Sequence, residues 1–290
     1  MADASRKQVA LITGGTDGLG KAAALLLAER GYRVFATGRS GERRAQLNAL
    51  ARERKLPLET LEMDVLDDGS VQRGVASVLE KAGEIDVLLN NAGVAYIATV
   101  EDMSMEDWRR QFESNFFSVV RVTQAVLPRM RERRSGRILM MSSVSGLVSP
   151  PTQGAYSASK HALEGLSNAL RIELHPFGVK VILIEPGYIV TNIQNVAVEL
   201  VQPYMDRVKS GPYAKIYAGA WVGAKESRTQ SNTTAEDCAR VILRAIEAPR
   251  PKARYGVTPL ATLIKWSKRL MTDGAIDAMI RRRYKIKSEA

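Results

Sequence analysis

The sequence predicts an α/β protein built on a doubly wound parallel sheet in a single domain. Short apolar runs alternate with longer amphipathic segments through most of the 290-residue chain, which is the pattern of consecutive β-α units. The connections are short, and the apolar runs lack the polar alternation of half-exposed strands, as expected when helices cover both faces of a sheet. The sequence contains no internal repeat and no linker, so it favours one domain over two.

The strands and helices are expected in regular order. Apolar runs predict strands at 8–12, 33–37, 57–63, 86–90, 137–141 and 179–184. Helical spacing of apolar residues predicts helices at 18–30, 41–54, 68–82, 104–134 (with room for one break) and 154–175. A helix at 234–248 and a strand at 254–257 complete the pattern. Ligands bind such sheets at the carboxyl ends of the strands, so site residues are sought there.

Two further regions do not follow this pattern. Residues 188–231 have no strand period and contain five aromatic side chains, so we expect a substrate lid beside the site. Two amphipathic stretches, at 259–271 and 273–284, close the chain. The sequence therefore divides into a dinucleotide-binding catalytic domain at 1–257, which includes the lid, and a basic amphipathic C-terminal helical extension at 258–290.

The chain is basic, with a formal net charge of +11. Residues 252–290 hold ten Lys or Arg against three Asp or Glu, so much of the surplus is C-terminal. A basic surplus suits nucleic acid, an anionic surface or an anionic ligand, but few aromatic residues lie among the basic ones and no nucleic-acid motif is present. We expect no nucleic-acid partner. A solvated basic face explains the tail most simply, and weak contact with an anionic membrane surface is the alternative.

Cysteine, histidine and hydropathy patterns narrow the class of protein further. Cys238 is the single cysteine, so no internal disulfide forms and a reducing compartment is indicated. His161 and His175 form no ligand cluster with it, so no metal site is expected. No apolar run reaches the roughly 18 residues of a membrane span, and the first strand begins near the N-terminus, so we expect a cytoplasmic protein.

A glycine-rich turn joins the first strand to the first helix. Gly14, Gly18 and Gly20 have the spacing Gly-x-x-x-Gly-x-Gly. Glycines let a diphosphate approach the backbone, and the helix N-terminus that follows supplies N–H groups and a positive dipole end. We therefore predict that a dinucleotide binds to the residues of this turn, which are Gly14, Thr16, Asp17, Gly18, Leu19 and Gly20.

The end of the second strand indicates which dinucleotide binds. An acidic residue there favours NAD, whereas arginine accommodates the 2′-phosphate of NADP. The sequence is Thr37-Gly-Arg-Ser40, without an acid, and the planar guanidinium of Arg39 can pair with phosphate. Arg43 and Arg44 follow one turn later and add positive field. We predict NADP(H) as the preferred cofactor, with NAD(H) as the alternative.

Tyr156 and Lys160 form the candidate catalytic centre. They are four residues apart in the helix at 154–175, so both side chains lie on one helix face. An ammonium beside a phenol stabilises the phenolate and lowers the pKa of the tyrosine. Such a tyrosine can exchange a proton with an alcohol or a ketone near neutral pH.

Taken together, these motifs resemble the short-chain dehydrogenase/reductase family in its single-domain, Rossmann-like form. The resemblance covers about residues 7–257, and the segments 156–167 and 185–188 are most similar to the branch with hydroxysteroid, retinol and 3-hydroxybutyrate dehydrogenases. The matching motifs follow the family's order and are Thr13-Gly-x-x-x-Gly-x-Gly20, Asp64-Val65, Asn90-Asn-Ala-Gly93, Asn115, Ser143, Tyr156-x-x-x-Lys160 and Pro186-Gly187 with Thr191.

The resemblance implies a role for each matching residue. Tyr156 would exchange a proton with the substrate oxygen, while Lys160 would lower its pKa and bond the nicotinamide ribose. Ser143 would hold the substrate oxygen and steady the developing charge, and Asn115 would link Lys160 to solvent through water. The remaining cofactor contacts would come from Asp64 at the adenine and from Val65, Asn91, Ala92, Gly93, Pro186, Gly187, Ile189 and Thr191.

The resemblance also sets the expected function. We expect an NADP(H)-dependent oxidoreductase that transfers a hydride between nicotinamide and a secondary alcohol or ketone, with a hydrophobic, lipid-, steroid- or retinoid-like substrate. Many NADP-using members carry a basic residue where this chain has Asp17, so an NAD(H)-dependent alcohol dehydrogenase of the same family is the alternative.

Two rival functions fit the sequence less well. A non-catalytic dinucleotide-binding sensor usually lacks the tyrosine or the lysine, and both are present here. An extended-family epimerase or dehydratase has a different glycine spacing. The long helices at 104–134 and 154–175 often pair between subunits in the family, which implies a homodimer or a homotetramer.

Overall fold

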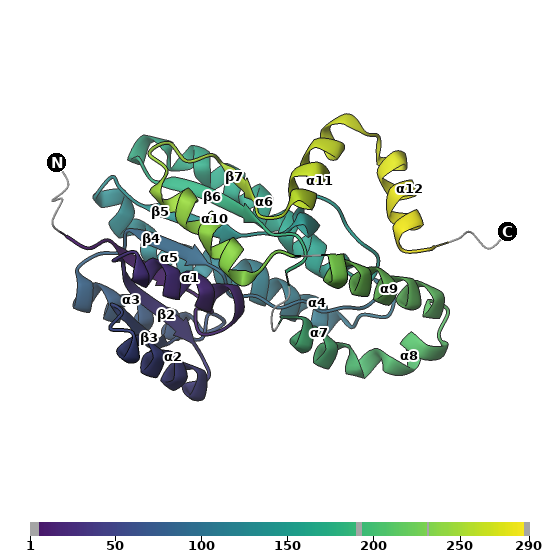
Figure 1. The fold of residues 1–290 in the computed structure, drawn as a ribbon, viewed down its shortest axis with the longest axis horizontal. Helices are drawn as coiled ribbons and strands as arrows, with labels where there is room; N and C mark the ends of the chain where they lie inside the picture. Colours follow the sequence, from purple (N-terminus) through teal and green to yellow (C-terminus); the bar gives the residue numbers. More distant parts are fainter. Residues whose placement is uncertain (1–5, 190–192, 231, 287–290) are drawn as a thin grey trace.

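A seven-stranded parallel sheet forms the centre of the molecule (Figure 1). The computed structural model describes residues 6–189, 193–230 and 232–286. The sheet order is β3-β2-β1-β4-β5-β6-β7, so the chain reverses its direction across the sheet between β1 and β4, where such folds bind ligands. The strands are β1 (Val9–Ile12), β2 (Arg33–Gly38), β3 (Leu58–Glu62), β4 (Val87–Asn90), β5 (Arg137–Met141), β6 (Lys180–Glu185) and β7 (Arg254–Gly256).

Helices cover both faces of the sheet, which confirms the predicted doubly wound fold. The helices of the β-α units are α1 (Gly18–Glu29), α2 (Gly41–Glu53), α3 (Asp68–Ala82), α4 (Met105–Phe112), α5 (Ser118–Glu132), α6 (Gly154–Glu173) and α10 (Ala235–Glu247). Alternate residues of β1 face opposite layers: Ile12 packs with α1, α2 and α10, and Leu11 packs with α3, α5 and α6. Both faces are therefore buried, which is why the strands read as apolar runs.

The long helix expected at 104–134 is interrupted. A π-helical segment, Glu113–Phe117, separates α4 from α5, and Asn115 lies within it, fully buried. An extra residue in a helical turn redirects the side chains on that turn, and such segments are frequent at functional sites. The helix expected at 154–175 ends at Glu173 and is followed by a 3-10 turn at His175–Phe177, because Pro176 cannot continue an α-helix.

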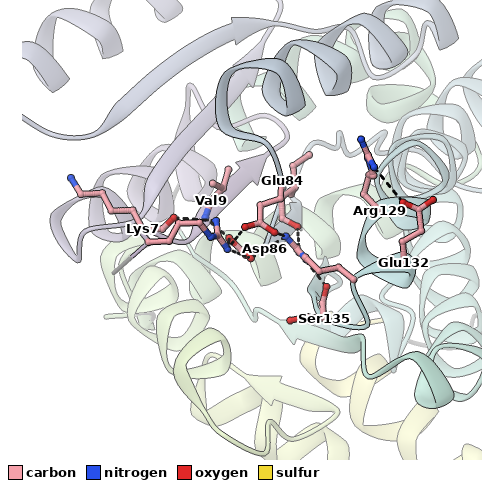
Figure 2. A network of polar contacts seen from close by, with 10 residues as sticks. Lys7, Val9, Glu84, Asp86, Arg129, Glu132 and Ser135 are labelled. Atoms are coloured by element: carbon pink, nitrogen blue, oxygen red, sulfur yellow. Dashed lines mark hydrogen bonds and ion pairs between the residues drawn. The ribbon is translucent and has the colours of Figure 1, made fainter. Parts of the chain in front are cut away.

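Charged residues close the amino end of the sheet, opposite the carboxyl ends of the strands. Figure 2 shows Glu84 and Asp86 at the centre of this network. Arg6 Nη2 lies 2.5 Å from Glu84 Oε1 and 2.9 Å from Asp86 Oδ1. Asp86 Oδ2 also accepts a hydrogen bond from Val9 N at 2.7 Å, and Arg133 Nη2 donates to Ile85 O at 2.8 Å. These charges thus tie β1 and β4 to the end of α5.

The segment after β6 is helical and lies to one side of the sheet (Figure 1). It contains α7 (Ile193–Val201), a 3-10 turn (Gln202–Tyr204), α8 (Met205–Ser210) and α9 (Ala214–Gln230). After β7, α11 (Pro259–Leu270) and α12 (Asp273–Arg283) form an arm that leaves the sheet and returns toward α9.

The arm ends against α9. A Cβ added to Gly219 would lie 2.1 Å from Tyr284 O, and one added to Gly223 would lie 2.7 Å from Tyr284 Cε1. The two glycines therefore let the chain after α12 approach α9 closely. None of the described helices has the length and apolar character that a membrane span requires.

Candidate active site

A cavity of about 2410 Å³ opens along the carboxyl ends of the strands. This volume exceeds the roughly 300–1,000 Å³ of a typical small-molecule pocket, so there is room for a dinucleotide and a second molecule. Nearly all of the site residues expected from the sequence line it, namely Gly14, Thr16, Asp17, Gly18, Leu19, Arg39, Asp64, Val65, Asn91, Ala92, Gly93, Asn115, Ser143, Tyr156, Lys160, Pro186, Gly187 and Ile189.

Two expected cofactor residues are not among those lining residues. Gly20 lies behind the turn, where an added Cβ would be 2.3 Å from Gly14 O and 2.5 Å from Asn91 Nδ2. Its hydrogen side chain therefore lets α1 pack against the turn. Thr191 lies outside the described residues.

Tyr156 and Lys160 lie in the first two turns of α6, one turn apart. Lys160 Nζ donates a hydrogen bond of 2.8 Å to Met141 O at the end of β5. The same ammonium lies 5.7 Å from the centre of the Tyr156 ring. Both residues line the cavity, as expected for side chains on one helix face.

Burial shifts the pKa values of both members of this pair. Burial raises the pKa of the Tyr156 phenol, and a hydrogen bond with Ser143 opposes that shift. Burial lowers the pKa of Lys160 to about 8, and the nearby Glu164 carboxylate opposes that shift. The net shift of the Tyr156 pKa is therefore upward, because loss of hydration disfavours the phenolate more than the Ser143 hydrogen bond favours it.

Ser143 lies two residues after β5, directly before a 3-10 turn at Val144–Gly146. Its Oγ accepts a hydrogen bond of 3.1 Å from Ser145 N, which holds the side chain at the cavity wall. Ser145 Oγ in turn donates to Gln153 Oε1 at 3.2 Å, one residue before α6 begins. The loop after β5 is thereby attached to the N-terminus of α6, and Ser143 and Tyr156 are held beside one another.

Asn115 connects the π-helical segment to the loop after β4. Its Nδ2 donates to Val94 O, and its Oδ1 accepts from Val94 N, both at 2.9 Å. A Cβ added to Gly93 would lie 2.9 Å from Asn115 Oδ1 and 3.9 Å from Lys160 Nζ. Asn115, Gly93 and Lys160 therefore surround one small space at the base of the cavity.

The glycine turn fits a dinucleotide. Gly14 and Gly18 have φ angles of +60° and +51°, values that favour glycine. A Cβ added to Gly14 would lie 3.0 Å from Ala92 Cα, and one added to Gly38 would lie 2.4 Å from Thr16 Oγ1. The ends of β1, β2 and β4 thus approach one another closely, and α1 begins there with its N-terminus at the cavity, as a diphosphate requires.

Arginines and carboxylates face one another where β2 ends. Arg39 Nη1 lies 3.8 Å from Asp64 Oδ2, and the Arg39 side chain is 67% exposed. Arg43 Nη1 lies 2.9 Å from Asp17 Oδ2. Asp17 also caps α1, its Oδ1 accepting from Gly18 N at 2.8 Å. Both arginines line the cavity. The Arg43 guanidinium neutralises the charge of the Asp17 carboxylate.

Two buried carboxylates and a partly buried arginine near the candidate catalytic pair were not expected from the sequence. Glu164 accepts a hydrogen bond of 2.5 Å from Ser142 Oγ and pairs with Arg254 on β7. Arg254 Nη1 also lies 2.6 Å from Glu185 Oε1 at the end of β6. Glu164 is four residues after Lys160, so the sequence itself indicates that the two lie on one helix face. The ion pair of Glu164 with Arg254 joins residues 90 positions apart, which no local pattern indicates.

The tyrosines of the segment after β6 hold it against the loop before α4. Tyr217 OH donates to Asp102 Oδ2 and accepts from Thr99 N, both at 2.9 Å. Tyr204 OH accepts from Ser104 N at 3.1 Å, and Tyr213 OH donates to Glu101 at 2.6 Å. The hydroxyls thus attach the 3-10 turn before α8 and the beginning of α9 to the loop before α4.

The sequence is similar to those of several known proteins. Residues 8–200 match a family model described as short chain dehydrogenase. The chain is 43% identical over 189 residues to the uncharacterized oxidoreductase YusZ of Bacillus subtilis, covering 64% of this chain and 67% of that protein. It is 41% identical over 180 residues to the 3-ketodihydrosphingosine reductase of Bacteroides thetaiotaomicron, covering 62% of this chain and 63% of that protein. The matches therefore span about two thirds of these relatives.

Solved structures share the fold over nearly the whole chain. A short chain dehydrogenase/reductase from Burkholderia phymatum in complex with NAD is 27% identical, with a TM-score of 0.79 over 94% of this chain and 95% of that one. Actinorhodin polyketide ketoreductase with NADPH is 30% identical, with a TM-score of 0.73 over 87% of this chain and 95% of that one. Structures similar to this chain thus contain either dinucleotide.

Proposed function

We propose, from the premise that this chain belongs to the short-chain dehydrogenase family of NAD(P)-dependent oxidoreductases, that it reduces a hydrophobic ketone with NADPH. The match over residues 8–200 establishes the family that the motifs predicted. One observation supports the specific proposal most strongly. The Tyr156 phenol, the Lys160 ammonium and the Ser143 hydroxyl line one cavity that is continuous with the glycine turn and with Arg39.

Tyr156 would act as the proton donor in the reduction. Its pKa is raised by burial, so the phenol is protonated at neutral pH and ready to donate to a carbonyl oxygen that becomes an alkoxide. Ser143, held by Ser145 N, would orient that oxygen by a hydrogen bond. Lys160, fixed to Met141 O, would supply positive charge beside the developing anion. The dinucleotide, when bound, supplies the hydride.

NADP(H) is the proposed cofactor because two arginines reach the end of β2. Arg39 and Arg43 line the cavity beside the glycine turn, where the 2′-phosphate of the adenosine half would lie. A guanidinium can bind a phosphate through two parallel hydrogen bonds. Asp64 and Asp17 form ion pairs with the two arginines at this place. Measuring turnover with NADH and with NADPH side by side distinguishes this proposal from the alternative of NAD(H).

The proposed substrate has an apolar body because many of the side chains that line the cavity around Tyr156 are apolar. Its lining includes Val148, Ile193, Val196, Val201 and Trp221. One relative is named for reduction of a keto lipid, 3-ketodihydrosphingosine, which supports a lipid-like ketone here. We propose that residues 188–231 act as the lid over this substrate and that residues 258–290 form a basic amphipathic C-terminal extension.

The test is NADPH oxidation with a panel of ketones of graded size, for wild type and Tyr156→Phe. The wild type should consume NADPH with at least the larger apolar ketones. The variant, which lacks the donated proton, should lose about 10²–10⁴-fold in kcat while NADPH still binds, as measured by fluorescence titration. Wild-type rates in Tyr156→Phe would remove the proposed mechanism.

We also propose a cytoplasmic homo-oligomer. Met105 on α4 and Ile172 on α6 are 63% and 73% exposed, and Phe117, the last residue of the π-helical segment before α5, is 48% exposed. Exposed apolar side chains on neighbouring helices favour burial against another copy. Light scattering after size exclusion should give a dimer or a tetramer, and a monomer at micromolar concentration would contradict this.

A further inference from the structure

The cavity continues far beyond the catalytic pair, into the space between the lid and the C-terminal arm. Its outer walls come from α7, α9, α11 and α12. Figure 1 shows α11 and α12 standing away from the sheet on the side of α9. The apolar side chains here stay open to solvent: Val198 is 43% exposed, Trp221 64%, Leu263 59% and Met279 51%. This outer part could bury an aliphatic chain.

The charges on the outer part of the cavity are strongly unbalanced. Six cationic side chains line it, namely Lys209, Lys225, Lys268, Arg282, Arg283 and Lys285. Among the described residues that line this part, Glu226 is the one carboxylate, and it lies 3.8 Å from Lys285 Nζ. Lys268 Nζ donates to Leu147 O at 2.6 Å, which brings this cation to the loop that follows Ser143.

At the cofactor end of the same cavity, carboxylates and arginines are present in similar numbers. There Arg43 faces Asp17, and Arg39 faces Asp64. Glu42 also lines that end. The surplus of cationic lining residues in the outer part is therefore not part of a uniform basic surface around the cavity.

We propose that the substrate is a long-chain ketone that carries an anionic group, a carboxylate or a phosphate, at the end remote from the carbonyl. The inference rests on the proposed function and specifies its substrate. The carbonyl would lie at Tyr156 and Ser143, the chain between the apolar walls, and the anion among the cations of α9, α11 and α12. Cations around a low-dielectric cavity attract an anion and repel an ammonium group.

The experiment compares four ketones of one chain length that differ only at the remote end: a carboxylate, a phosphate ester, the methyl ester of the carboxylate, and a primary amine. The kcat/KM of each is measured at saturating NADPH. We expect the carboxylate or the phosphate to exceed the methyl ester by about tenfold and the amine to fall below it, since charged contacts across partly buried surfaces have this size. Whichever anion is preferred identifies the head group.

The double variant Arg282→Gln/Arg283→Gln tests whether the preference for an anionic ketone depends on the cations of α12. Its kcat/KM for the anionic ketones should fall about tenfold, and that for the methyl ester should stay within about twofold. Arg281→Gln is the matched control, because Arg281 is on the same turn of α12 and does not line the cavity. Raising the ionic strength should lower kcat/KM of wild type for the anions alone, a readout that does not depend on the variants.

Two results would overturn the inference in different ways. Equal kcat/KM for the anions and the methyl ester, insensitive to salt and to Arg282→Gln/Arg283→Gln, refutes the anionic substrate and leaves the ketone reductase intact. Absence of NADPH oxidation with all four compounds and with the neutral ketone panel refutes the proposed function itself.

Discussion

Burial lowers the pKa of Lys160 to about 8, and the Glu164 carboxylate one helical turn away opposes that shift. Glu164 is itself held by the Ser142 hydroxyl and by Arg254. Ser142 directly precedes Ser143, so the same carboxylate contacts the loop that carries one catalytic candidate and adjusts the protonation of another. We regard Glu164 as a positioning residue of the site.

Replacing Glu164 with Gln should move the pH profile of reduction. The proposed mechanism requires a protonated Lys160 in the free enzyme, so kcat/KM for NADPH should fall on the alkaline side with a midpoint near the Lys160 pKa of about 8. Without the carboxylate the ammonium loses a favourable charge, so the midpoint should move to lower pH, by on the order of one unit. Glutamine can keep the Ser142 and Arg254 contacts. An unmoved alkaline limb with reduced kcat would mean that Glu164 acts on structure alone.

Lys160→Met should stabilise the fold while it removes activity. The pKa of Lys160 falls from 10.5 in the unfolded chain to about 8 in the folded protein. At pH 7 the unfolded state therefore holds the proton more tightly, which costs the folded state about 3 kcal/mol. This cost is fully present below pH 8 and disappears as the pH rises from about 8 to 10.5.

Urea unfolding at two pH values measures this effect. At pH 7 Lys160→Met should exceed wild type by about 1–3 kcal/mol in free energy of unfolding, because the lost bond to Met141 O offsets part of the gain. Near pH 10.5 the two proteins should be closer in stability. A difference that stays the same at both pH values would show that the charge of Lys160 is not its source.

Arg39→Gln should weaken NADPH selectively. The loss of a charge-assisted pair with the 2′-phosphate should raise KM for NADPH about tenfold or more, with KM for NADH little changed. Arg44→Gln is the matched control, because Arg44 pairs with Glu62 and is absent from the cavity lining. If Arg39→Gln changes both KM values alike, the proposed NADP(H) preference does not depend on this residue.

Tyr217→Phe should loosen the segment over the cavity. The substitution leaves Asp102 and Thr99 N without a buried hydroxyl partner, which costs about 1–3 kcal/mol. Limited proteolysis should cut residues 193–230 faster in this variant, and KM for a large ketone should rise. Tyr213→Phe, whose bond to Glu101 is exposed, should change stability by only about 0.5 kcal/mol. Equal proteolysis of both variants would argue against a buried latch.

The sequence was sufficient for features that depend on neighbours along the chain. Strand and helix periods are local, so the β-α order and the parallel sheet could be predicted, as could the glycine turn between β1 and α1. Tyr156 and Lys160 were found for the same reason, because a spacing of four residues fixes their relation within α6. The family resemblance added Asn115 and Ser143, which lie far from that pair in sequence and beside it in the cavity.

Tertiary structure decided what depends on burial and on distant partners. The pKa of Tyr156 is raised and not lowered, because packing removes water from the phenol. Glu164 meets Arg254 across 90 residues, a contact that no periodicity encodes. The π-helical turn at Asn115 and the approach of Tyr284 to α9 likewise follow from long-range packing. The spacing of the candidate catalytic residues Tyr156 and Lys160 is therefore set by local sequence, whereas their protonation and the shape of the space they face are set by the fold.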